Sequence, residues 1–167
     1  MIYSSNNLEK ILNKEIDIFN KIYKLENIKT NAIIERDGKL LESLARQHEK
    51  HLSEIESLET NRTNLTKFIK NNHKVNSYSK DITLKDIAAL SDNSSVRLLS
   101  TGKKLKNILM QIKHLQNINQ KLLDDNMEFY NSISRELKNL ATQKSGYTDI
   151  GSEKTEVINS LYINKKI

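Results

Sequence analysis

The sequence predicts an all-α fold: an antiparallel, coiled-coil-like bundle of three long helices, with a short helix in the connection between the second and the third. The 167 residues include no proline and only four glycines, so the residues that most strongly break helices are nearly absent. Apolar residues recur at steps of three and four along three long segments, which is the spacing of amphipathic helices.

The first long helix is expected over residues 6–36. Asn6 and Glu9 form the pattern of a capping box, which marks a helix start. Arg36, Asp37 and Gly38 are a turn signal, and Gly38 suits the left-handed conformation that closes many helices. The apolar stripe of this helix comprises Leu8, Ile11, Leu12, Ile16, Phe19, Ile22, Tyr23, Ile33 and Ile34.

The second long helix is expected over residues 39–71, and the short turn before it makes the pair an antiparallel hairpin. Residues 71–82 have no periodicity and are expected to form a loop. Thr83 and Asp86 repeat the capping-box pattern and predict a short helix over 83–90. The stripe of the second helix comprises Leu41, Leu44, His48, Leu52, Ile55, Leu58, Arg62, Leu65 and Ile69.

The third long helix is expected over 95–143, after a break at 91–95. It exceeds its partners by about 20 Å, so its C-terminal end must be exposed, kinked or covered by another segment. Two glycines and a helical apolar pattern follow, so we expect a single domain over 1–144 and a glycine-hinged amphipathic tail over 145–167. The stripe of the third helix comprises Leu98, Leu105, Ile108, Ile112, Leu115, Leu122, Phe129, Ile133, Leu137 and Leu140.

Composition narrows the class of protein. No apolar run approaches the roughly 18 residues of a membrane-spanning helix, and the first residues lack a signal-like core. We therefore expect a cytoplasmic protein without membrane insertion. Cysteine is absent, which argues against disulfides and thiolate metal sites.

The net charge of +6 is unevenly placed, because no acid occurs between Arg97 and Lys121. A cationic segment of this kind suits nucleic acid, an acidic protein or simple solvation. It contains no aromatic platform and no arginine cluster, so we expect no nucleic-acid partner. The basic residues of the segment are Arg97, Lys103, Lys104, Lys106, Lys113 and Lys121.

The sequence offers no catalytic or cofactor site. His48 and His51 flank Glu49, but the zinc-protease signature needs histidines four residues apart, and here the spacing is three. No nucleophile elbow and no glycine-rich phosphate loop occur. We therefore predict that the protein is not an enzyme and that it uses no metal or cofactor.

Polar residues interrupt the predicted stripes and form a polar seam. Asn119 and Asn126 are seven residues apart on the third long helix, where a polar side chain lowers stability but specifies register. Glu59 and Arg62 are three residues apart on the second helix and can pair. Because Arg62 is on the seam, we expect it to neutralise a carboxylate of a neighbouring helix, with Glu15 and Glu26 as candidates.

Several motifs also occur in a characteristic order. They are Glu15 and Lys29 with the aliphatic residues that follow, the Glu-x-x-Arg step of Glu59 and Arg62, the segment 83–90, Asn119 before Leu122 and Leu123, and the turn at 145–151. Over roughly residues 8–151 this order resembles the flagellar hook-junction export chaperones, the FlgN-like family.

The resemblance implies a cytoplasmic chaperone that holds hook-associated junction proteins before their export through the flagellar type III apparatus, by binding their aggregation-prone terminal helices. It also makes the export apparatus a second candidate partner. A helix over 153–166 is marginal alone in water and can become ordered against a client helix. The candidate client-binding residues are Phe129, Ile133, Leu137, Tyr147, Ile150, Val157, Ile158, Leu161 and Tyr162.

A structural coiled-coil or scaffold protein without an export role is the alternative interpretation. The breaks at Gly38, 71–82 and 91–95 favour a compact bundle over one long coiled coil. The sequence leaves open the identity of the client, the stoichiometry, homo-oligomer formation, and whether the tail first docks on its own bundle.

Overall fold

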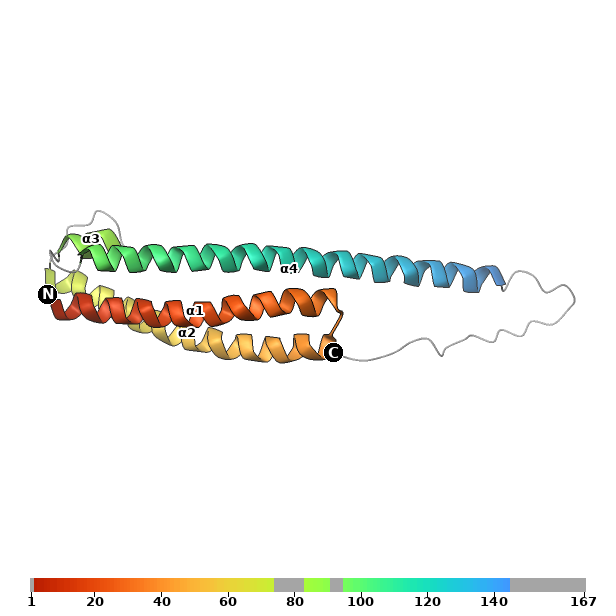
Figure 1. The fold of residues 1–167 in the computed structure, drawn as a ribbon, viewed down its shortest axis with the longest axis horizontal. Helices are drawn as coiled ribbons and strands as arrows, with labels where there is room; N and C mark the ends of the chain where they lie inside the picture. Colours follow the sequence, from red (N-terminus) through yellow and green to blue (C-terminus); the bar gives the residue numbers. More distant parts are fainter. Residues whose placement is uncertain (1, 74–82, 91–94, 145–167) are drawn as a thin grey trace, which may run out of the picture. The chain divides into compact units, whose positions relative to one another are not determined.

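The computed structural model describes residues 2–73, 83–90 and 95–144. They form α1 (Ile2–Ile34), α2 (Gly38–His73), α3 (Leu84–Ala89) and α4 (Ser95–Lys144), and none of these residues forms a strand (Figure 1). The prediction of an all-α protein with three long helices and one short helix is therefore confirmed.

The chain divides into two units, Met1–Met127 and Glu128–Ile167, and the boundary falls within α4. Within the second unit, the structure describes residues 128–144 as helix. The predicted tail at 145–167 lies outside the described residues, so its division from a domain over 1–144 stays a prediction.

Three predicted boundaries of the long helices are wrong: the start of α1, the end of α1, which lies at Ile34 and not at residue 36, and the end of α2. α1 begins at Ile2, so Asn6 is a residue inside the helix and its capping-box pattern does not mark the start. The side chain of Ser5, directly before Asn6, is buried, so the helix already packs against its neighbours at this position. Residues 71–73, expected in a loop, are the last residues of α2.

The turn between α1 and α2 uses Arg36 as its left-handed residue, with a φ of 57°. Asp37 N donates to Ala32 O at 2.9 Å, which is the closing bond of a Schellman motif. Asp37 Oδ1 accepts from Leu40 N at 3.0 Å and thereby caps α2. Because Asp37 performs both tasks, Gly38 is already the first residue of α2, and the prediction of a left-handed cap at Gly38 is wrong.

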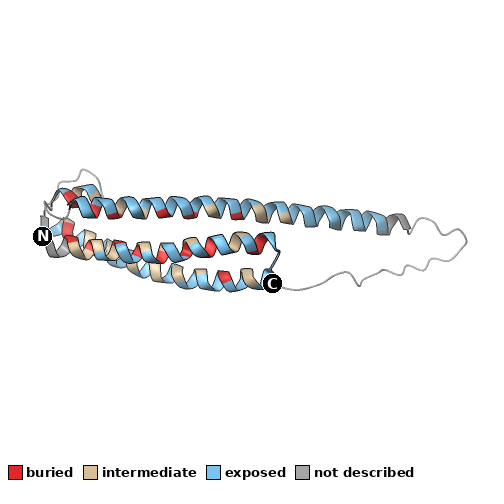
Figure 2. Ribbon diagram, in the orientation of Figure 1, coloured by how far each residue is buried: buried red, intermediate tan, exposed pale blue. Residues whose placement is uncertain are grey.

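Three apolar clusters form the core of Met1–Met127, and Figure 2 marks their buried residues along the helices. The first cluster joins all four helices and comprises Leu8, Leu12, Ile69, Ile87, Ala88 and Leu98. The second comprises Ile18, Ile22, Ile108 and Ile112, with Ile55 and Leu58 of α2 packed against it. The third joins α1 to α2 and comprises Leu25, Ala32 and Leu44.

These clusters give the direction of each helix in Met1–Met127. Leu8 shares a cluster with Ile69, whereas Ala32 shares one with Leu44, so residue numbers fall along α2 as they rise along α1. Numbers rise together along α1 and α4, because Leu98 lies in the cluster of Leu8. In these contacts α2 therefore runs antiparallel to α1 and to the first part of α4.

The predicted capping box of α3 is confirmed. Asp86 N donates to Thr83 Oγ1 at 3.3 Å, and Thr83 N donates to Asp86 Oδ2 at 2.8 Å. α3 then approaches α4 closely at Gly102, where an added Cβ would overlap the tip of the Leu84 side chain. This approach explains a glycine in the interior of a long helix, where it lowers helix stability.

Candidate functional site

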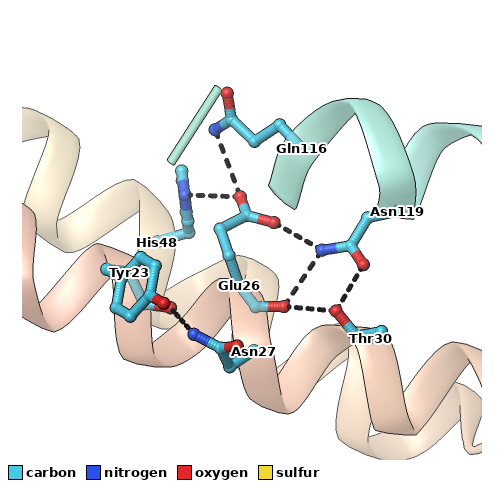
Figure 3. A network of polar contacts seen from close by, with 7 residues as sticks. All are labelled: Tyr23, Glu26, Asn27, Thr30, His48, Gln116 and Asn119. Atoms are coloured by element: carbon cyan, nitrogen blue, oxygen red, sulfur yellow. Dashed lines mark hydrogen bonds and ion pairs between the residues drawn. The ribbon is translucent and has the colours of Figure 1, made fainter. Parts of the chain in front are cut away.

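Asn119 of α4 lies on the polar seam and bonds to α1 (Figure 3). Its Nδ2 donates to Glu26 Oε2 at 2.8 Å and to the backbone oxygen of Glu26 at 3.0 Å. Its Oδ1 accepts from Thr30 Oγ1 at 2.7 Å. Asn119 is 1% exposed and Glu26 is 2% exposed, so these bonds replace water for both side chains. A slip of α4 along α1 would break all three, so they specify the register between these helices.

Glu26 connects α1 to both other long helices. Gln116 Nε2 of α4 donates to Glu26 Oε1 at 3.2 Å. His48 Nε2 of α2 lies 3.2 Å from the same oxygen but lacks hydrogen-bond geometry, so the contact is an ion pair when the imidazole is protonated. Glu26 therefore has Asn119 as its short hydrogen-bond partner, and it is not the carboxylate that Arg62 contacts.

Arg62 of α2 pairs with Glu15, one of the two carboxylates considered from the sequence. Arg62 Nε donates to Glu15 Oε1 at 2.9 Å, and Arg62 Nη2 donates to Glu59 Oε1 at 3.3 Å. The Glu15 side chain is 3% exposed, whereas those of Arg62 and Glu59 are 35% and 61% exposed. Burial raises the pKa of Glu15, and the hydrogen bond and charge of Arg62 oppose this rise without cancelling it.

Asn126 contacts the last turn of α1, where its Nδ2 donates to Ile33 O at 3.3 Å. The same carbonyl also accepts from Arg36 N at 3.2 Å, so Asn126 supplies a second donor at the C-terminal end of α1. The predicted seam residues therefore occupy separate positions: Glu59 and Arg62 lie together, whereas Asn119 and Asn126 make their own contacts with α1. Arg62, Asn119 and Asn126 each connect two helices, and the four seam residues do not line one common pocket.

The described residues of the second unit carry a different feature, an exposed apolar stripe on α4. All described side chains from 128 to 140 are exposed. Steps of four, four and three place the main members on one helical face. The rings of Phe129 and Tyr130 are in edge contact, with centroids 6.1 Å apart. We call this set the distal α4 stripe: Phe129, Tyr130, Ile133, Leu137 and Leu140.

Three predicted client-binding residues, Phe129, Ile133 and Leu137, lie in the distal α4 stripe, and their exposed fractions are 48%, 38% and 59%. Sequence reasoning did not include Tyr130 as a candidate, although its step of three to Ile133 was a usable signal. The other candidates lie outside the described residues and stay predictions: Tyr147, Ile150, Val157, Ile158, Leu161 and Tyr162.

Membrane-spanning helices and metal sites are two further features that residues 2–73, 83–90 and 95–144 could carry. No helix in these ranges is long and apolar enough to cross a membrane. No three histidine or acidic side chains among them are grouped so that they could hold a metal ion. His48 and His51 instead face glutamates, Glu26 at 3.2 Å and Glu54 at 3.5 Å.

The described residues thus form helices, with buried polar contacts between helices in Met1–Met127 and an exposed apolar stripe on the helix of the second unit. A family model described as FlgN protein matches residues 1–155, and the chain belongs to this family. Membership confirms the resemblance found in the sequence and implies a flagellar export chaperone role. No curated protein and no solved structure matches the chain.

Proposed function

We propose that this chain is a cytoplasmic chaperone that binds amphipathic terminal helices of hook-associated junction proteins and keeps them unassembled until export through the flagellar type III apparatus. The observation that carries this proposal is the distal α4 stripe, whose apolar side chains are exposed on one helical face. Family membership supports the general role. In this proposal the export apparatus is a second partner, and no nucleic acid, metal or cofactor takes part.

The distal α4 stripe has the spacing that a client helix needs. Residues at steps of three and four on one helix pack against the same steps on another. Full burial of a leucine, isoleucine or phenylalanine side chain stabilises a complex by about 1.5–3 kcal/mol. Burying Phe129, Ile133 and Leu137 together therefore contributes several kcal/mol before the cost of ordering the partners.

The remaining parts of the chain have separate roles in this proposal. The antiparallel bundle of α1, α2 and α4 is the scaffold, and the seam bonds of Asn119 and Arg62 keep its helices in register. The tail at 145–167 is a second client-binding segment, which packs on the client through the apolar face that contains Val157, Ile158, Leu161 and Tyr162.

The direct test removes the stripe by changing Ile133→Asp together with Leu137→Asp. The readout is calorimetric affinity for a peptide with the sequence of the client's terminal helix. We expect affinity to fall more than tenfold, which corresponds to about 1.4 kcal/mol. A matched control, Phe68→Asp with Val96→Asp, changes two side chains that are 59% and 78% exposed on other surfaces and should leave affinity unchanged.

Thermal melting of each variant shows whether the bundle is affected. Because both target side chains are exposed, the melting temperature should stay near that of the wild type. Normal binding by the double variant would contradict the proposed role of the stripe. The scaffold alternative predicts instead that the double variant loses self-association in sedimentation experiments while a client peptide binds neither protein.

The tail is tested independently. A chain ending at Lys144 should keep its melting temperature and lose client affinity, and Ile158→Asp with Leu161→Asp should do the same at full length. If these variants melt early but bind the client normally, the tail stabilises the bundle and is not a client-binding segment.

A further inference from the structure

The first part of α4 carries an exposed cationic surface that the proposed client site does not use. We call it the proximal cationic face. All its members are exposed, and none forms an ion pair with any residue that the structure describes. The members are Lys103, Lys106, Lys113 and Lys121, whereas the basic residues Arg97 and Lys104 project from another side of α4.

The net charge of the chain corresponds to this part of α4. The chain has 27 basic and 21 acidic residues, and residues 97–121 hold six basic residues and no acid, so the rest of the sequence has 21 of each and is balanced. Lys103 and Lys106 are one helical turn apart, where like charges destabilise a helix. No acid occurs between Arg97 and Lys121 to offset this repulsion within the helix.

Apolar side chains lie among the cations on the same side of the helix. The sequence of steps from Leu99 through Lys103, Lys106 and Met110 to Lys113 is four, three, four and three, which traces one continuous face. Leu99 is 40% exposed and Met110 is 57% exposed. The buried side of this part of α4 is formed by different residues, which include Leu98, Ile108 and Ile112.

We propose that the proximal cationic face docks an acidic amphipathic helix of a protein partner. Carboxylates of such a helix pair with Lys103, Lys106 and Lys113, while its apolar residues pack on Leu99 and Met110. The charge complementarity removes the repulsion along the face and speeds association. This inference concerns a surface separate from the distal α4 stripe and does not depend on the proposed client binding.

Two other anionic partners fit the face less well. Single-stranded nucleic acid is recognised by stacking on aromatic side chains and by arginine, and between residues 95 and 121 there is one arginine and no Phe, Tyr or Trp. A membrane-surface helix must insert a broad apolar face into lipid. Here the broad apolar face of α4 is buried in the core clusters, and the exposed apolar side chains of this part, Val96, Leu99, Leu109, Met110 and Ile118, are spread over about half of the helix circumference.

The test uses the full-length chain and a fluorescent helical peptide made of repeated Glu-Leu-Glu-Ala-Leu-Glu-Ala heptads. Anisotropy titrations at low and at physiological ionic strength give its affinity. Lys103→Gln, Lys106→Gln and Lys113→Gln combined should weaken binding about tenfold, the effect expected from losing three exposed ion pairs. The matched control Lys14→Gln, Lys21→Gln and Lys24→Gln removes three exposed lysines from α1 and should change binding less than twofold.

Further arms separate local recognition from bulk charge. A peptide with every glutamate replaced by glutamine should fail to bind, and Leu99→Gln with Met110→Gln should weaken binding of the acidic peptide. Equal weakening by both triple-lysine variants would overturn the proposal. The proposal would also be overturned if duplex DNA, single-stranded RNA or phosphatidylserine vesicles bound more tightly than the peptide and the triple-lysine variant of α4 abolished that binding.

Discussion

Asn119 Nδ2 donates to Glu26 Oε2 at 2.8 Å, and this bond joins α4 to α1 across 93 residues of sequence. Both side chains are buried, so neither has water as an alternative partner. A hydrogen bond to a charged, desolvated group is stronger than one between neutral groups. The bond therefore makes one alignment of α1 and α4 more stable than its neighbours.

Replacing Asn119 by leucine should destabilise the protein by about 2–3 kcal/mol, because the Glu26 carboxylate stays buried and loses its shortest hydrogen bond. Urea unfolding monitored by circular dichroism measures this change. Asn117→Leu, a matched change at an exposed position of α4, should stay within about 0.5 kcal/mol of the wild type. Adding Glu26→Leu to Asn119→Leu should restore most of the stability. If the single and the double variant are equally stable, the assigned bond is refuted.

Glu15 should make stability depend on pH. Because its pKa is raised in the folded state, its stabilising contribution is fully present below the unfolded value near 4.5 and is lost as pH rises through the folded pKa. Glu15→Gln removes this titration. Relative to the wild type, the variant should therefore gain stability between about pH 4 and about pH 7. Urea unfolding at both pH values tests the sign, and a variant that loses stability over this interval would contradict it.

Arg62→Leu leaves the buried Glu15 carboxylate without its guanidinium partner. Breaking a fully buried pair costs about 3–5 kcal/mol. Since the Arg62 side chain is 35% exposed, water screens the interaction, and we expect a loss of about 2 kcal/mol. In the Glu15→Gln background the same change should cost less, and an equal loss in both backgrounds would show that the two side chains are not coupled.

Gly38→Ala should stabilise the protein by about 0.4–1 kcal/mol, because Gly38 is helical and nothing lies within 4 Å of an added Cβ. Gly102→Ala should gain less, since its Cβ displaces the Leu84 side chain. Thermal melts in the wild-type and Leu84→Ala backgrounds distinguish the two effects. If Gly38→Ala is destabilising, Gly38 and not Arg36 adopts the left-handed conformation.

The apolar spacing and the capping box at Thr83 were sufficient to predict four helices, because both signals act within one or two turns of the chain. The order of short motifs was sufficient to suggest the family, and the family match confirms it. From the excess length of the third long helix, its C-terminal end was expected to be exposed, kinked or covered by another segment. In the structure Phe129, Ile133 and Leu137 are exposed.

Other features were decided only by tertiary structure. From the sequence, Glu15 and Glu26 were equal candidates for the partner of Arg62, and only the contacts between the helices pair Arg62 with Glu15 and Asn119 with Glu26. The left-handed turn residue is Arg36, because Asp37 must bond to Ala32 and also cap α2. Such choices depend on the register of segments far apart in the chain, whereas the local spacing that predicts a helix is the same in every register.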